Sequence, residues 1–403
     1  MPEILMTHRP QALLQLTARL TLILVAGVLI TQREGIAESF EERAKEYLED
    51  LLLTREQVDQ WIRGHGRERY DPDIGWVHIE WWGRDGIDGA ASTYRYEPSG
   101  ARRIIAYREK PCRINTYGNS FTHCDQVSDG ETWQERLATH LCEPVRNFGV
   151  SGHSVYQMYV RMKREEAHTP AEYIIVNIYS DDHYRSLRPW DAIVGGTRTT
   201  EPYVVVNASK GTFEEHENPC PTPESLYNLC DLDWVLDRFK DNIVLRRRVG
   251  VREDLIELAR EHGKTIDANT DGDLGEIIGD LRTETAFFAS MRIIERIEEF
   301  AAAHGKKVLY VLSYTTYALT DTVQQGSRFD QAFVDFLDEK GLPYVDLLAA
   351  HLEDFAKFDL SIKDYIKRYY IGHYSPLGNA FCAYAIKDKL PEIMEPKPVT
   401  YRK

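Results

Sequence analysis

Ser120 stands at a point in the sequence where a nucleophile is expected. It belongs to the segment TYGNSFT, residues 116–122, which ends an apolar, strand-like stretch. A serine placed where a strand gives way to a helix or tight turn presents its hydroxyl at the carboxyl edge of a sheet, and the adjacent Gly118 permits close backbone approach. The pattern therefore indicates covalent chemistry at Ser120, although a turn serine that caps a helix has the same sequence signature.

A serine nucleophile needs a base, and His373 is the candidate. It precedes the last predicted helix, on a loop that can reach the carboxyl edge of a parallel sheet. If the backbone N–H groups of Ser120 and Gly152 point at the developing oxyanion, each contributes roughly 3 kcal/mol to the transition state. The competing interpretations are a hydrogen-bonded loop histidine and, for Gly152, a helix N-cap.

Three further segments lie after predicted strands or before the last predicted helix: NFGVSGHS (147–154), NIYSDDH (177–183) and GHYSPLGN (372–379). Together with GNSFT they resemble the four sequence blocks of the SGNH (GDSL) hydrolase superfamily. The likeness covers residues 112–182 and 306–390. It implies a nucleophile at Ser120, a base at His373 and an oxyanion-binding backbone N–H at Gly152.

The resemblance implies a serine hydrolase that cleaves an ester through a Ser-His acyl-enzyme, with no cofactor. We consider an O-acyl group on a carbohydrate as the ester, because 23 Tyr and 7 Trp are plentiful and aromatic rings suit sugars. The substrate would be a small molecule or a carbohydrate ester. Two other functions fit the same scaffold: an acyltransferase on the same serine, and a non-catalytic ligand-binding protein.

Three departures from the family pattern bear on activity. The oxyanion-binding Asn of the third block aligns with Asp181, or with Ser180 if the register slips by one. A carboxylate at that place would repel an oxyanion. The usual Asp three residues before the histidine is Tyr370, so the orienting acid is missing or comes from elsewhere, such as Asp364. The Asp of the first block is Asn119, a milder change.

No metal site is expected. Residues 181–183 offer two carboxylates and an imidazole, but three consecutive residues cannot easily converge on one ion, and Arg185 and Arg188 would pair with the aspartates more simply. Residues 267–274 match the opening of a calcium loop of the EF-hand type. Ile278 occupies the twelfth position, where a bidentate Glu is needed, so a solvated acidic turn is the favoured interpretation.

The elements that must position these residues alternate between strands and helices. Strands are predicted near residues 113–120, 144–152, 173–180, 307–314 and 343–348, with helices between them, including 284–303, 329–337 and 377–390. This alternation predicts a three-layer α/β sandwich with a central, mostly parallel sheet. The resemblance makes it a flavodoxin-like sheet of the SGNH hydrolase type.

The chain divides into three segments, and the third carries an insertion. Residues 1–37 are a signal peptide or a first helix, because residues 20–30 are apolar but too short to span a bilayer. Residues 38–111 form two helices and then a β-rich stretch. Residues 112–403 form the α/β domain, interrupted by an insertion at about 182–280 that lacks regular alternation.

The charge composition argues against nucleic acid as a binding partner. The 64 acidic residues outnumber the 49 basic ones, giving a net charge of −15, which disfavours nucleic acid. No membrane span is expected. The six cysteines leave the compartment open between periplasmic or secreted and cytoplasmic, and only Cys220 and Cys230 are close enough in sequence to suggest a bridge. The sequence does not determine the oligomeric state.

Overall fold

A five-stranded parallel sheet forms the centre of the molecule. The computed structural model describes residues 39–64, 66–266 and 273–402, and its central strands run in the order β11-β10-β7-β5-β6. The strands are β5 (Ile114–Tyr117), β6 (Val145–Asn147), β7 (Tyr173–Tyr179), β10 (Lys307–Ser313) and β11 (Tyr344–Asp346). Numbered along the chain this is the 2-1-3-4-5 order of flavodoxin-like sheets. The predicted α/β fold is confirmed.

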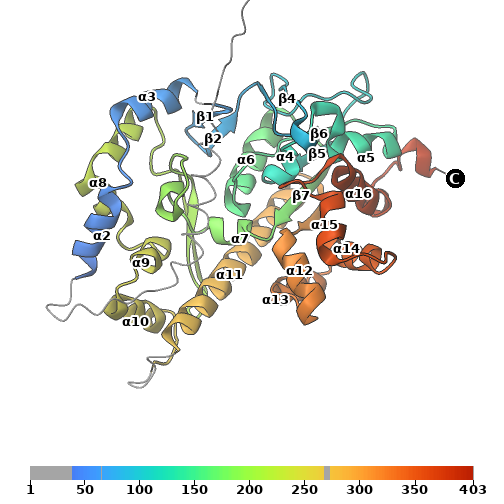
Figure 1. Cartoon of the computed structure of the whole chain (residues 1–403). Helices are drawn as coiled ribbons and strands as arrows, with labels where there is room; N and C mark the ends of the chain where they lie inside the picture. Colours follow the sequence, from blue (N-terminus) through green and yellow to red (C-terminus); the bar gives the residue numbers. More distant parts are fainter. Residues whose placement is uncertain (1–38, 65, 267–272, 403) are drawn as a thin grey trace, which may run out of the picture.

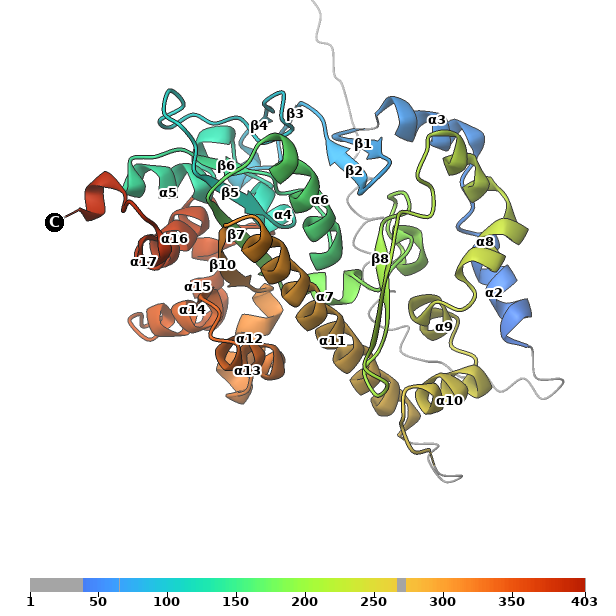
Figure 2. The same ribbon diagram turned by 180° about the vertical axis from the view of Figure 1, so that it is seen from behind.

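Helices cover both faces of the sheet, as Figures 1 and 2 show. One layer contains α6 (Val155–His168) and α11 (Leu274–Ala303), which contact each other. The other contains α5 (Trp133–Leu141), α14 (Leu347–Phe355), α15 (Ile362–Tyr369) and α16 (Pro376–Ile386). Because both faces are covered, the long strands β7 and β10 are almost wholly buried and therefore consist mainly of apolar residues.

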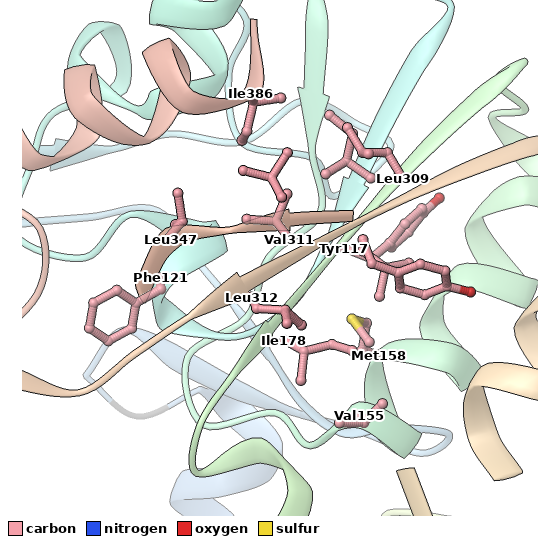
Figure 3. Close-up of a cluster of buried hydrophobic side chains, with 14 of the residues drawn as sticks. Tyr117, Phe121, Val155, Met158, Ile178, Leu309, Val311, Leu312, Leu347 and Ile386 are labelled. Atoms are coloured by element: carbon pink, nitrogen blue, oxygen red, sulfur yellow. The ribbon is translucent and has the colours of Figure 1, made fainter. Parts of the chain in front are cut away.

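The main core lies between these layers. Ile178, Leu309 and Val311 project from the sheet, and Met158 and Ile386 meet them from the two helical layers (Figure 3). Each such side chain contributes about 1.5–3 kcal/mol when it is fully buried. This core fixes the carboxyl ends of the strands, where the candidate site lies.

The N-terminal segment contains two capped helices followed by short antiparallel strands. These are α2 (Phe40–Glu49), α3 (Arg55–Arg63), β1 (Glu68–Asp71) paired with β2 (Gly75–His78), and β3 (Trp81–Gly83) paired with β4 (Ser92–Tyr94). Ser39 and Thr54 start the helices, because each side chain accepts from a backbone N–H three residues later.

The insertion is more regular than the sequence indicated. It contains α7 (Asp182–Arg185), the hairpin β8 (Tyr203–Asn207) and β9 (Thr212–His216), then α8 (Leu232–Phe239), α9 (Ile243–Val249) and α10 (Arg252–Glu261). Helix α11 begins at Leu274, ten residues before the predicted start at 284. Apolar residues on several faces of this helix pack against both the insertion and the sheet, which obscures a simple amphipathic period.

The remaining helices are α4 (Ser120–His123), α12 (Thr316–Gln325), α13 (Gln331–Glu339) and α17 (Leu390–Ile393).

A second core joins the N-terminal segment to the insertion. Leu48 and Trp61 from α2 and α3 are buried in one cluster with Trp190, Phe239 and Leu245 from the insertion. Figure 1 shows α2 beside α8 and α9, on the side of the molecule away from α14 and α16. Helices α2 and α3 therefore build one lobe together with the helices of the insertion.

Four further expectations from the sequence concern the cysteines, the apolar run, the calcium-like segment and membrane spans. Cys220 and Cys230 do not form a bridge: all six thiols are free, with Cys220 buried in the second core and Cys230 at the end of a 3-10 helix, Glu224–Cys230. The apolar run at 20–30 and most of the calcium-like segment lie outside the described residues. Among the described helices, none has the length and apolar character needed to cross a membrane.

Candidate active site

Ser120 is the first residue of the short helix α4, directly after β5. Its neighbour Asn119 caps that helix, with Oδ1 accepting from the N–H of Phe121 at 2.8 Å. Gly118 has φ +157°, and a Cβ there would lie 2.1 Å from Oγ1 of Thr122, so the strand-to-helix turn requires glycine. The turn places Ser120 at the carboxyl edge between β5 and β7, where the strand order reverses and ligands bind in such sheets.

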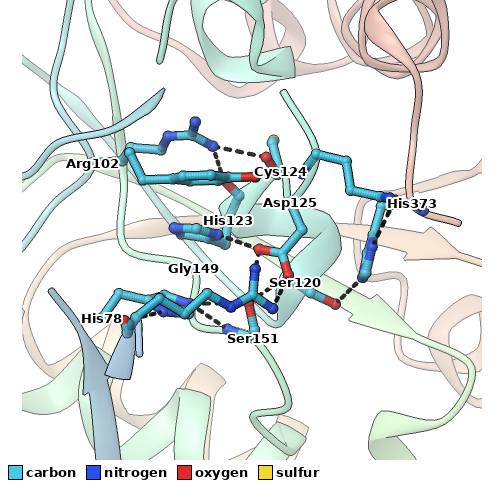
Figure 4. Close-up of polar contacts among 12 residues, drawn as sticks. His78, Arg102, Ser120, His123, Cys124, Asp125, Gly149, Ser151 and His373 are labelled. Atoms are coloured by element: carbon cyan, nitrogen blue, oxygen red, sulfur yellow. Dashed lines mark hydrogen bonds and ion pairs between the residues drawn. The ribbon is translucent and has the colours of Figure 1, made fainter. Parts of the chain in front are cut away.

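His373 reaches Ser120 from the loop before α16. Its Nε2 lies 2.9 Å from Oγ of Ser120, although 253 positions separate the two residues (Figure 4). This is hydrogen-bonding distance for a base that takes a proton from a hydroxyl.

Gln126 is the side chain that faces the other nitrogen of His373. Its Oε1 accepts from the backbone N–H of His373 at 2.7 Å and lies 3.3 Å from Nδ1. The amide is itself held, because Nε2 donates to the carbonyl of Asp85 and the backbone N–H donates to Oη of Tyr94. Gly372 makes room, since a Cβ there would lie 2.8 Å from Oε1. An oxygen at Nδ1 favours the tautomer that leaves Nε2 free to accept a proton.

The acid suggested by the sequence does not occupy this position. Asp364 is an exposed residue in the first turn of α15, where it bonds Ser361 and Lys367. Tyr370 is buried, and its hydroxyl lies 3.3 Å from Nε2 of His351. Sequence reasoning missed Gln126 because no local spacing links a residue after α4 to a loop near the end of the chain.

Burial lowers the pKa of His373 below its ordinary value. The Asp125 carboxylate opposes this shift, while the charges of Arg67 and Arg185 add to it. The imidazole is therefore neutral, and able to accept a proton, down to a lower pH than a free histidine.

A buried polar network supports α4 from behind. Asp125 accepts from Nδ1 of His123 at 2.5 Å, from Oγ of Ser151 at 2.8 Å and from Arg67 at 3.0 Å (Figure 4). Burial opposes ionisation of Asp125, but these contacts hold its pKa well below its usual range. Burial also lowers the pKa of His123 to about 4, so the pair is a neutral imidazole and a carboxylate.

The same network brings three metal-ligand side chains together. Atoms of His78, His123 and Asp125 lie within 4.8 Å of one another. The hydroxyl of Tyr96 lies 2.8 Å from Nε2 of His123, and the guanidinium of Arg67 already supplies a cation to Asp125. Because the donors are already paired in this way, the residues form a structural network and do not fit an ion as they stand.

The loop after β6 packs directly on α4. A Cβ at Gly149 would lie 2.2 Å from the backbone nitrogen of His123. Three residues on, Gly152 has φ +82°, and a Cβ there would lie 2.7 Å from Nη1 of Arg198. Among the described residues, neither the N–H of Ser120 nor that of Gly152 donates a hydrogen bond to another residue, so both can bind a ligand atom.

The residues after β7 do not present the side-chain donor that the sequence resemblance led us to expect there. Ser180 is buried, and its hydroxyl accepts from the N–H of Thr315 at 3.2 Å. Asp181 points to the surface, with 54% of its side chain exposed and its carboxylate 3.8 Å from Arg185. Asp182 is the buried carboxylate instead, and it accepts from the side-chain amide of Asn119 at 2.8 Å. Asn119 therefore ties α4 to the end of β7.

Comparisons with solved structures give a distant likeness, whereas comparisons of sequence give none. No family model matches the chain, and no curated protein matches it in sequence. Among solved structures, the chain is similar to a G-D-S-L family protein from Desulfitobacterium hafniense DCB-2 that is described, provisionally, as lipolytic. The identity is 11% and the TM-score 0.35, over 69% of this chain and 99% of that one.

Proposed function

We propose that this protein is a serine hydrolase that cleaves a carboxylic ester through an acyl-enzyme on Ser120. One observation carries the proposal: Oγ of Ser120 lies 2.9 Å from Nε2 of His373 at the carboxyl edge of the sheet. A nucleophile and base at this distance, with the base held from its far side, are the parts that acyl transfer needs.

The first half of the reaction forms the acyl-enzyme. Nε2 of His373 takes the hydroxyl proton as Oγ of Ser120 attacks the ester carbonyl. The carbonyl oxygen becomes an oxyanion, for which the N–H groups of Ser120 and Gly152 are the proposed donors. The imidazolium then gives its proton to the leaving alcohol as the C–O bond breaks.

The second half restores the serine. Water loses a proton to Nε2 and attacks the acyl carbon, and the proton returns to Oγ of Ser120 as the acid departs. Throughout, Oε1 of Gln126 can accept a hydrogen bond from Nδ1–H. The amide oxygen carries only a partial negative charge, so it stabilises the imidazolium less than a carboxylate would.

The aromatic residues bear on the nature of the ester. Three of the rings that suggested a carbohydrate are used for packing, since Tyr94 and Tyr96 stack on His123 and Trp81 packs on Tyr94. An acyl group on a sugar therefore has no support from an exposed aromatic platform among these residues.

A fluorophosphonate probe tests the proposal. We expect it to label Ser120, and Ser120→Ala to abolish labelling and the hydrolysis of short activated esters while the circular dichroism spectrum is unchanged. Ser209→Ala, at an exposed serine of the β8–β9 hairpin, is the control. Unlabelled Ser120 in folded protein would support a binding role and overturn the proposal. Labelling combined with product transfer to an added alcohol in preference to water would indicate an acyltransferase.

A further inference from the structure

A cavity rich in arginine lies beside the candidate site. It has a volume of about 400 Å³ and is bordered by Arg185, Arg188, Arg247, Arg248 and Arg282. These residues come from α7 and the loop after it, from α9 and from α11, so the insertion and α11 form its wall together. Among the residues that the structure describes, Asp181 is the only carboxylate on its wall. For a chain with a net charge of −15, this gathering of positive charge is notable.

Two of these arginines are neutralised by neighbouring carboxylates. Arg188 pairs with Asp191 and Glu201. Arg185 donates to Asp182 at 2.7 Å. Their charges are therefore used within the protein.

Arg247 and Arg282 have no such partner. Neither forms an ion pair with a carboxylate in the described part of the chain, and Nε of Arg247 is buried without any hydrogen bond there. Burial, together with the nearby charge of Arg282, lowers the pKa of Arg247 to about 10. The guanidinium of Arg282 lies 4.0 Å from the ring centre of Tyr184. Two cations without counter-charges, one with a buried unpaired donor, are unfavourable unless an anion joins them.

The cavity is coupled to Ser120 through a short chain of contacts. Arg185 on its wall bonds Asp182, which accepts from Asn119, the residue that caps the helix of Ser120. The charge of Arg185 is also felt at His373, whose pKa it lowers. Neither Ser120 nor His373 lines the cavity, so a ligand held there must extend beyond the cavity wall in order to reach the serine.

We infer that this cavity binds an oxyanionic group, a carboxylate or a phosphate, through Arg247 and Arg282, and that the ester substrate carries this group away from its scissile bond. The second clause rests on the proposed hydrolase function, whereas the first does not. The planar guanidinium presents paired N–H donors that match either group. Tyr184 and Val244 supply apolar wall for the part of the ligand that joins the anion to the ester.

Direct binding tests the first clause without any catalysis. Inorganic phosphate and acetate are titrated separately at constant ionic strength into the wild-type protein, Arg247→Gln, Arg282→Gln and the double variant, by calorimetry. We expect saturable binding to the wild type and a loss of at least about tenfold in affinity for each single variant. Arg136→Gln, at an exposed position on α5, is the matched control and should bind as the wild type does.

Thermal unfolding provides a second readout. Because Arg247 is unpaired, Arg247→Gln should unfold at the same or a higher temperature than the wild type without ligand. The rise that the tighter-binding anion gives to the wild type should be smaller in this variant. Equal rises in the wild type and Arg247→Gln would mean that the anion acts as a general salt, and would overturn the inference.

Paired substrates test the second clause. Two p-nitrophenyl esters of equal chain length are compared, one ending in a methyl group and one in a carboxylate. We expect Arg247→Gln to raise KM for the charged ester at least about tenfold and to leave the neutral ester unchanged. Equal effects on both esters would overturn this clause. Anion binding that is lost in the variants, with no turnover of either ester by the wild type, would support the cavity and contradict the hydrolase.

Discussion

Gln126 holds His373 from the side that faces away from Ser120. Its amide oxygen accepts from the backbone N–H of His373 at 2.7 Å and lies 3.3 Å from Nδ1. Gln126 is itself in a left-handed conformation with φ +72°, which costs a non-glycine residue free energy and persists only where the surroundings impose it. A neutral amide thus occupies the position at which a carboxylate would be expected beside such a histidine.

Replacement of Gln126 tests its role in positioning the histidine. Gln126→Ala should lower kcat by roughly tenfold or more, because the imidazole loses its fixed orientation and tautomer. Gln126→Glu should instead raise the pKa of His373 and move the acid limb of the kcat/KM profile to higher pH. Gln331→Ala, at an exposed site on α13, is the control. A kcat unaffected by both changes would exclude the orienting role.

The lowered pKa of His373 predicts how the activity of the wild-type protein depends on pH. Burial lowers the pKa of His373, so the neutral base should persist and the acid limb of kcat/KM should lie below pH 6.5, the ordinary value. Arg185→Gln removes a cation that contributes to the lowering, and the limb should then move upward. A wild-type limb above 6.5 would show that another group titrates.

Gly149→Ala tests the packing of the loop after β6 on α4. The new Cβ would lie 2.2 Å from the backbone nitrogen of His123, which cannot move without shifting the helix of Ser120. We expect the free energy of unfolding to fall by about 1–3 kcal/mol or more, measured by urea denaturation. Gly130→Ala is the matched control, since a Cβ there meets no atom within 4 Å. Equal stabilities for the two variants would contradict the close approach.

Asp181→Asn should change little. The side chain is 54% exposed and its pairing with Arg185 at 3.8 Å is a surface contact, worth about 0–1 kcal/mol. We therefore expect kcat/KM within roughly fivefold of the wild type. A rise of tenfold or more would instead place the carboxylate against the oxyanion during the reaction, a geometry that the side chain does not have here.

The fold could be predicted from the sequence because the two long strands of the sheet have a recognisable apolar composition. Residues 173–179 and 307–313 are mainly apolar, and such runs between amphipathic helices permit few arrangements. The proximity of Ser120 to His373 followed in the same way, because both segments end at one edge of the sheet. The side-chain partners of the site could not be predicted from apolar patterns. Gln126 and Asp125 have no distinguishing spacing, and Asp364 is close to the histidine in the sequence only.

The lobe formed by α2, α3 and the insertion could not be predicted from the sequence either. Trp61 and Phe239 share a core, yet nothing local in either segment identifies the other as its partner. Helical spacing reveals that α2 and α3 have apolar faces, but the surface that covers them depends on contacts between residues far apart in the chain. The arginine cavity was equally hidden, because its members come from separate helices.

The shared core of the N-terminal helices and the insertion also sets an order of events during synthesis. Leu48 and Trp61 leave the ribosome well before Phe239 and Leu245, which bury them. At a synthesis rate of about 5–20 residues per second, the apolar faces of α2 and α3 stay exposed for roughly ten seconds or more before the residues that bury them are made. Helices α2 and α3 therefore pack into their core late in synthesis. A nascent chain halted before α9 would expose an apolar surface of the kind that chaperones bind.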